Sequence, residues 1–229
     1  PLKKRYLSLL SVKDGKWETL LIKEMKPFES YEINYEAISY FINQKSMPIL
    51  SLTEKPLEKS LTDLPTNTIP NTTPEWRASI CIHRKGNTSS YQGEIQPFPE
   101  KATLLSFSTF LQKKHQVKNF LLFINTENKP IQRVSNLILT LANKPNSTID
   151  EISVSSNTCN FIDLNKYKIN DENLLVIYSH QISGIPIFFS YSDDDNSMSL
   201  EHTHPPQEYL FLGDRNLYQK KKKSFWLNE

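Results

Sequence analysis

The sequence predicts a mainly β protein: an antiparallel β-sandwich or jelly roll preceded by a small N-terminal unit with a β-hairpin and a short helix. Short apolar segments recur roughly ten residues apart from Trp76 onward, separated by polar turns and without a helical period. The chain has 12 Phe, 10 Tyr and 3 Trp to fill a core. With only 5 Gly but 14 Pro, we expect its turns to be made largely with Asn, Asp, Ser and Pro.

The first expected element is a hairpin around Asp14-Gly15. This dipeptide lies between two apolar runs and suits a two-residue turn in which both residues have positive φ. Such a turn fixes the register of the two strands, because each residue of one strand then faces a defined partner. The expected pairs are Val12 with Trp17, Leu9 with Leu20, and Leu7 with Ile22.

A short helix from about Tyr35, capped near Asn34, is expected next, because apolar residues follow at helical spacing. The proline-studded stretch after it has little periodicity, which predicts an extended connector. These features divide the chain into an N-terminal unit (1–50), a connector (51–75), a sandwich domain (76–217) and a basic-aromatic tail (218–229).

Within the sandwich domain, two segments are apolar at five consecutive positions, 120–124 and 174–178. Strands of this kind are covered on both faces, so both should be central in their sheets. We expect turns at NKPNST (143–148) and YSDDDNSMS (191–199). The two cysteines, Cys81 and Cys159, are expected to be reduced and buried.

Composition excludes few functions. A net charge of +2 is too balanced for the field of a dedicated nucleic-acid binder. No stretch reaches the length of a membrane span, and the N-terminal apolar run is too short for a signal peptide, so we expect a cytoplasmic protein. Glycine-rich phosphate loops, Cys-x-x-Cys pairs and the common hydrolase motifs do not occur in the sequence.

The stretch SLEHTHPPQEYLFLG (199–213) holds the candidate metal ligands. In a strand, His202 and His204 project to the same side, close enough for both imidazoles to bind one divalent transition metal. Glu208 could supply a third ligand or act as the catalytic residue of an enzyme, and His83 or His180 could supply a fourth ligand. The favoured alternative is that both histidines lie on the polar side of a late strand, bonded to backbone or water.

The segment His202-Thr-His204 followed by Glu208 resembles the first metal-binding motif of the cupin family. That resemblance implies a jelly roll in which the two histidines and the glutamate ligate a metal. The sequence departs from the motif at Asn196, where the family has a leading Gly, and at Gly213, which comes early. Only 16 residues follow for a second motif.

A second candidate site combines aromatic and hydrogen-bonding side chains at Trp76, Arg77, Tyr91 and Glu94. This mixture suits the binding of a polar small molecule such as a carbohydrate, and equally suits packing at a sheet edge. The acidic run Asp193 to Asn196 is expected to be a solvated hairpin tip, with calcium binding as its alternative.

The tail LYQKKKKSFWLNE joins Lys220–Lys223 to Phe225 and Trp226. This composition suits a peripheral contact with anionic lipid, or a solvated chain end whose aromatics dock on the domain. The sequence thus leaves three hypotheses for function. They are a non-catalytic module for a polar ligand or a protein partner, a metal-dependent jelly-roll enzyme, and a peripheral membrane accessory protein.

Overall fold

The computed structural model describes residues 3–41, 48–65, 78–93, 97–107, 117–167, 174–194, 197–202 and 215–228. The chain forms two compact units. The first contains Pro1–Arg77 together with Glu127–Gln132, and the second contains Ala78–Thr126 together with Arg133–Glu229.

The N-terminal unit contains a four-stranded sheet in the order β3-β1-β2-β4. Its elements are β1 (Arg5–Lys13), β2 (Lys16–Met25), α1 (Tyr35–Ile38), β3 (Ile49–Thr53) and β4 (Ser60–Leu61). The predicted hairpin turn is confirmed, with φ of 49° at Asp14 and 70° at Gly15. The short helix begins at Tyr35 as predicted. The sequence predicted only an extended connector over 51–75. Strand β4 lies wholly in this range and β3 partly in it.

The hairpin register follows the prediction up to a β-bulge. Val12 pairs with Trp17 and Leu9 with Leu20, as expected. The expected pairing of Leu7 with Ile22 is wrong, because Leu7 pairs with Lys23 across a register shift between Leu7 and Ser8. A bulge places one extra residue on one strand, here Ile22, and so shifts every later partner by one.

Trp17 is the centre of the small core of this unit. Its side chain is fully buried and packs with Leu10, Val12 and Leu64. The indole N–H donates a hydrogen bond of 2.9 Å to the carbonyl of Asn128, which satisfies the ring's only polar group. The segment 127–132 therefore contributes a hydrogen-bond acceptor to the first unit although it lies between two strands of the second.

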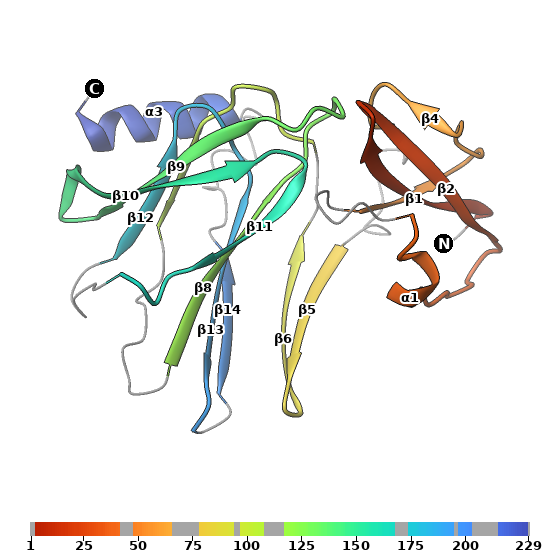
Figure 1. The fold of residues 1–229 in the computed structure, drawn as a ribbon, viewed down its shortest axis with the longest axis horizontal. Coiled ribbons are helices and arrows are strands. Elements are labelled where there is room, and N and C mark those ends of the chain that lie inside the picture. The colour runs from red at the N-terminus through yellow and green to blue at the C-terminus, as the bar shows by residue number, and fades with distance from the viewer. Residues whose placement is uncertain are drawn as a thin grey trace. The chain divides into compact units, whose positions relative to one another are not determined.

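The second unit is an antiparallel β-sandwich, as the sequence predicted. One sheet has the order β10-β9-β12-β7 and the other β11-β8-β13-β14, while β5 and β6 form a separate hairpin (Figure 1). The strands are β5 (Ala78–Arg84), β6 (Asn87–Gly93), β7 (Leu104–Phe107), β8 (Val117–Asn125), β9 (Val134–Leu141), β10 (Lys144–Ser155), β11 (Thr158–Asp163), β12 (Leu175–Ser179), β13 (Ile185–Ser192) and β14 (Met198–His202). The two continuous apolar runs form β8 and β12, which are interior strands as predicted.

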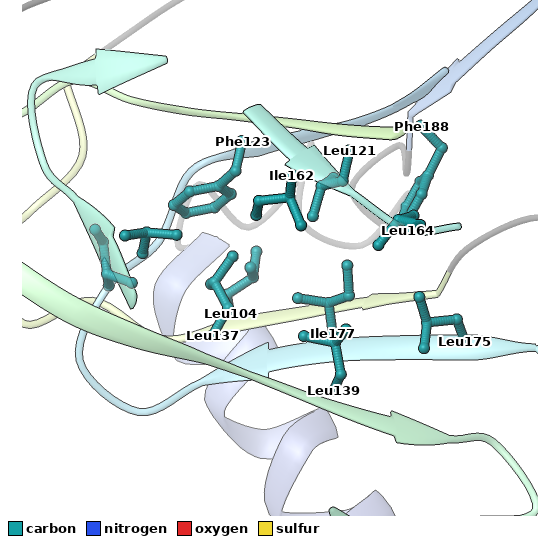
Figure 2. Packing of buried hydrophobic residues seen from close by; sticks show 12 residues of the cluster. Leu104, Leu121, Phe123, Leu137, Leu139, Ile162, Leu164, Leu175, Ile177 and Phe188 are labelled. Carbon is teal, nitrogen blue, oxygen red and sulfur yellow. The ribbon is translucent and has the colours of Figure 1, made fainter. Parts of the chain in front are cut away.

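The sandwich core is a double layer of aliphatic and aromatic side chains. Figure 2 shows one layer, with Leu121, Phe123 and Ile162, facing a second layer with Leu137 and Ile177. All five are buried, and burial of such side chains is the main favourable term in folding. Alternation along each strand sends their neighbours to the outer faces.

Two expectations about this unit are wrong. NKPNST was expected to be a turn, but only Ala142 and Asn143 form the turn, and β10 begins at Lys144. The irregular start of β10 lies around the Thr140 hydroxyl, which is 2.7 to 3.1 Å from the carbonyl oxygens of Lys144, Pro145 and Ser147. The cysteines, expected to be buried, are both exposed; neither forms a disulfide.

The C-terminal segment is the helix α3 (Arg215–Leu227), although the sequence predicted a tail from residue 218. Figure 1 shows α3 beside the sheet that contains β12, and it contacts β7 and β10. Trp226 packs edge-on against Phe107 and Tyr178, with ring centroids 5.7 and 6.4 Å apart. The docking of the tail aromatics, one of the two predicted alternatives, is thus observed for Trp226.

Candidate ligand-binding face

The outer face of the sheet β11-β8-β13-β14 carries a row of aromatic side chains. Strand alternation brings Phe161 of β11, Phe120 of β8, and Phe189 and Tyr191 of β13 to this face, and we call these four residues the aromatic row. The Phe120 ring is stacked with the other three, at centroid distances of 4.9 Å to Phe161, 6.0 Å to Phe189 and 5.7 Å to Tyr191.

Exposure rises along the row toward β11. Phe189 is 8% exposed, whereas Phe161 is 61% exposed; Phe120 and Tyr191 are half-buried. An exposed aromatic ring at a sheet surface leaves apolar area in contact with water, which a bound ligand can cover. Phe161 is therefore the part of the row that is most open to a ligand.

Basic side chains cover the other end of the row. The Arg84 guanidinium, from the β5–β6 hairpin, lies 3.8 Å from the centre of the Tyr191 ring, and the Lys118 ammonium lies 5.7 Å from it. These are cation–π distances. The hairpin is held in place at this point because β6 also contacts β14.

Asp193 joins these basic groups at the predicted hairpin tip. Its carboxylate accepts a hydrogen bond from the Arg84 guanidinium and lies 3.7 Å from the ammonium groups of both Lys85 and Lys118. The hydrogen bond from Arg84, together with the nearby positive charges, lowers the pKa of Asp193 against the opposing effect of desolvation. Asp193 is therefore committed to an ion-pair network, which argues against its use as a calcium ligand.

Polar groups lie beside the open end of the row. Asp163, directly opposite Phe120 in the β-ladder, accepts hydrogen bonds from the backbone N–H and the side-chain amide of Asn165, at 2.8 and 2.6 Å. The Asn165 side chain in turn bonds to both backbone groups of Asn119. Asp163 and Asn165 are exposed, so this end of the row combines an open ring with a fixed carboxylate and amide.

The site residues predicted from the sequence fall mostly outside the described residues. Trp76, Arg77, Glu94, His204 and Glu208 all belong to that group. Of the other two, Tyr91 has its backbone in β6, paired with Ile80, and His202 ends β14, paired with Ile187.

The two additional histidines considered as metal ligands each have a neighbour at one ring nitrogen. The Nδ1 atom of His83 is 2.8 Å from the Thr88 hydroxyl, and Nδ1 of His180 accepts a hydrogen bond of 2.8 Å from the Lys223 ammonium. Among the described residues, no group of three or more His, Cys, Asp or Glu side chains is placed to hold a metal ion.

Cys159 lies on the same outer face as Phe161, two residues earlier in β11. It is exposed, yet neighbouring atoms desolvate the sulfur enough to raise the pKa of the thiol. A raised pKa disfavours the thiolate, which is the nucleophilic form. Cys159 is thus a neighbour of the aromatic row rather than a candidate nucleophile.

Sequence reasoning did not find the aromatic row, because its four members come from three strands far apart in the chain. The signal that could have found the row is an aromatic residue at an outward-facing position of each of these strands.

No family model, curated protein or solved structure matches this chain.

Proposed function

We propose that this protein is a non-catalytic β-sandwich module that binds a carbohydrate on the outer face of the sheet β11-β8-β13-β14. The observation that carries the proposal is the exposed ring of Phe161, stacked on Phe120 next to fixed polar groups. The proposal keeps the ligand class expected from the sequence but rests on different residues.

The chemistry of a sugar ring fits this arrangement. A pyranose has a face of C–H groups and a rim of hydroxyl groups, so it needs an apolar flat surface with hydrogen-bonding groups beside it. The Phe161 ring offers the flat surface. The Asp163 carboxylate can accept hydrogen bonds from hydroxyl groups, and the Lys118 ammonium, whose side chain is 51% exposed, can donate them.

A protein partner is the main competitor for this face, because exposed aromatic side chains also mark protein interfaces. The fixed positions of Asp163 and Asn165 favour the sugar, since a small set of oriented polar groups is typical of small-molecule sites. The metal-dependent enzyme with His202, His204 and Glu208 stays a prediction that no described contact favours.

Native gel electrophoresis in the presence of soluble polysaccharides tests the proposal. Gels containing starch, hydroxyethyl cellulose, xylan or galactomannan should retard the wild-type protein in at least one case. Phe161→Ala should abolish that retardation. Val134→Ala is the matched control, because Val134 is 70% exposed but belongs to β9 in the other sheet, and it should be retarded like the wild type.

Two outcomes would overturn the proposal. One is the lack of retardation in all four polysaccharides; the other is equal retardation of the wild type and Phe161→Ala. Far-ultraviolet circular dichroism of each variant checks that the β-sandwich is retained. If Phe161→Ala does not retain the β-sandwich, Asp163→Asn takes its place as the test variant, because it keeps the side-chain shape but removes the charge.

A further inference from the structure

The helix α3 has one side anchored to the sandwich. Lys223 is 4% exposed and Leu227 6% exposed, and the Lys223 ammonium donates hydrogen bonds to the Ser179 carbonyl and to His180 Nδ1, at 3.3 and 2.8 Å. Trp226 lies against Phe107 and Tyr178 on the same sheet. Docking thus involves Lys223, Trp226 and Leu227.

The opposite side of α3 combines apolar and basic groups that face solvent. Leu217 is 50% exposed and Phe225 is 83% exposed. Residues four apart lie on the same helix face, so Lys221 falls between them. Lys220 and Lys222 are also exposed, and residues 215–228 contain no Asp or Glu.

We infer that this exposed side of α3 binds the surface of a lipid bilayer that contains anionic lipid. The three exposed lysines would lie at the anionic headgroups, while Phe225 and Leu217 would enter the boundary between headgroups and acyl chains. The contact is peripheral: none of the helices in the described segments has the length and apolarity required to span a bilayer.

The exposed apolar side chains favour lipid over nucleic acid as the polyanion. A nucleic-acid site needs several cations along a phosphate backbone, and single-stranded binders add a series of aromatic rings for stacking. Among the side chains that the structure describes, the solvent side of α3 offers one aromatic ring and one leucine beside its lysines, which is the composition of an interfacial helix. The inference does not depend on the proposed function, since α3 covers the sheet opposite the aromatic row.

Sedimentation of the full chain with vesicles tests the inference. The protein should sediment with phosphatidylcholine vesicles that contain phosphatidylserine, and not with vesicles of phosphatidylcholine alone. Replacing Lys220–Lys222 by Gln should weaken binding by about fivefold per lysine. Phe225→Ala should weaken it by about threefold or more, because less apolar area enters the membrane.

A charge-matched control distinguishes the contribution of this surface to vesicle binding from the contribution of the protein's net charge. Lys16→Gln, Lys55→Gln and Lys144→Gln in one protein remove three exposed lysines elsewhere, and this variant should bind the anionic vesicles like the wild type. Equal weakening of the two triple variants would overturn the inference, as would unchanged binding of Phe225→Ala. Binding to a single-stranded DNA oligonucleotide without binding to the anionic vesicles would also overturn it, in favour of nucleic acid.

Discussion

The two outer faces of the sandwich differ in what covers them. On the sheet β10-β9-β12-β7, Val176 and Tyr178 point away from the core but are only 0% and 7% exposed, and Tyr178 lies against Trp226 of α3. On the sheet β11-β8-β13-β14, Phe161 points outward and is 61% exposed. On one face the protein's own helix therefore packs over the side of β12, whereas the other face leaves an aromatic surface open.

The difference matters because β8 and β12 have the same sequence signature. Each lies in a run of five consecutive apolar residues, 120–124 and 174–178, which indicates apolar surroundings on both faces. For β12 the second face is provided by a helix from the end of the chain. For β8 the described neighbours of Phe120 on this face are aromatic side chains, and Phe120 and Leu122 remain half-buried. A strand of continuous apolar residues thus predicts apolar surroundings on both faces. It does not indicate whether a packed element covers the second face or whether that face stays open.

The largest expected effect on stability comes from a substitution at Gly184, which lies against the core between the two sheets. A Cβ atom at Gly184 would lie 2.6 Å from the Phe123 ring and 2.6 Å from the Ile124 carbonyl oxygen. Phe123 is fully buried, so its ring has no room to move away. Gly184→Ala should lower the free energy of unfolding by about 3 kcal/mol, measured by urea denaturation, and should loosen both sheets together.

Ser183→Ala is the neighbouring control for that substitution. The buried Ser183 hydroxyl has no hydrogen-bond partner within the described segments, so its removal should change the free energy of unfolding little. Equal stability of the wild type and Gly184→Ala would show that the close approach at Gly184 is not a feature of the folded protein.

Trp226→Ala tests the closed face alone. It removes the half-buried ring that packs on Phe107 and Tyr178 and should lower the free energy of unfolding by about 2 kcal/mol, less than for a fully buried Trp. Hydrogen exchange should rise in β12 and remain unchanged in β11. Phe225→Ala is the control, since that ring is 83% exposed; a similar loss of stability in both variants would contradict the assignment of the docked side.

The closed face also shows why part of the fold was not predictable from the sequence. Alternation and the Asp14-Gly15 turn correctly predicted strands, interior positions and the hairpin register from the turn up to the bulge at Ile22, because these depend on residues close in sequence. The helical tail was missed because Lys220–Lys223 gave the segment the composition of a solvated chain end. Its helical structure includes contacts of Trp226 and Lys223 with strands far away in sequence, which no local pattern contains.

The candidate site was less predictable for the same reason. Phe120 was assigned to a central strand, but the row exists only through the order β11-β8-β13 in the sheet. Strand order is set by tertiary packing, and the local pattern of a single sequence does not reveal which strands are neighbours. The predicted pair His202 and His204 came from adjacent positions in sequence, which is the only kind of cluster that local reading can find.

Phe161→Ala should lower stability less than Gly184→Ala or Trp226→Ala. Because the ring is 61% exposed, its removal exposes little further apolar area, and the free energy of unfolding should fall by less than about 1 kcal/mol. Urea denaturation beside Trp226→Ala measures the contrast between the two faces. A loss as large as that of Trp226→Ala would mean that the aromatic row is a structural cluster and not an open surface.

The smallest expected effect concerns the charged end of the aromatic row. The hydrogen bond from Arg84 lowers the pKa of Asp193 in the folded protein, while the unfolded chain keeps the ordinary value of about 3.9. The unfolded state therefore binds the proton more readily, and the stability that Asp193 contributes is present above about pH 4 and is lost as the pH falls through the folded pKa. The melting temperature of Asp193→Asn should accordingly approach that of the wild type below about pH 4.

The neighbouring carboxylate provides the control for this pH dependence. Asp194 is exposed, and the described part of the structure shows no ion pair for it, so Asp194→Asn, unlike Asp193→Asn, should leave the melting temperature at neutral pH unchanged. Since the carboxylate of Asp193 faces solvent, the difference should be small and should shrink further when salt screens the surrounding lysines. A wild-type profile for Asp193→Asn would mean that Arg84 is held over Tyr191 by the ring alone, which would leave the guanidinium free to bind the ligand of the open face.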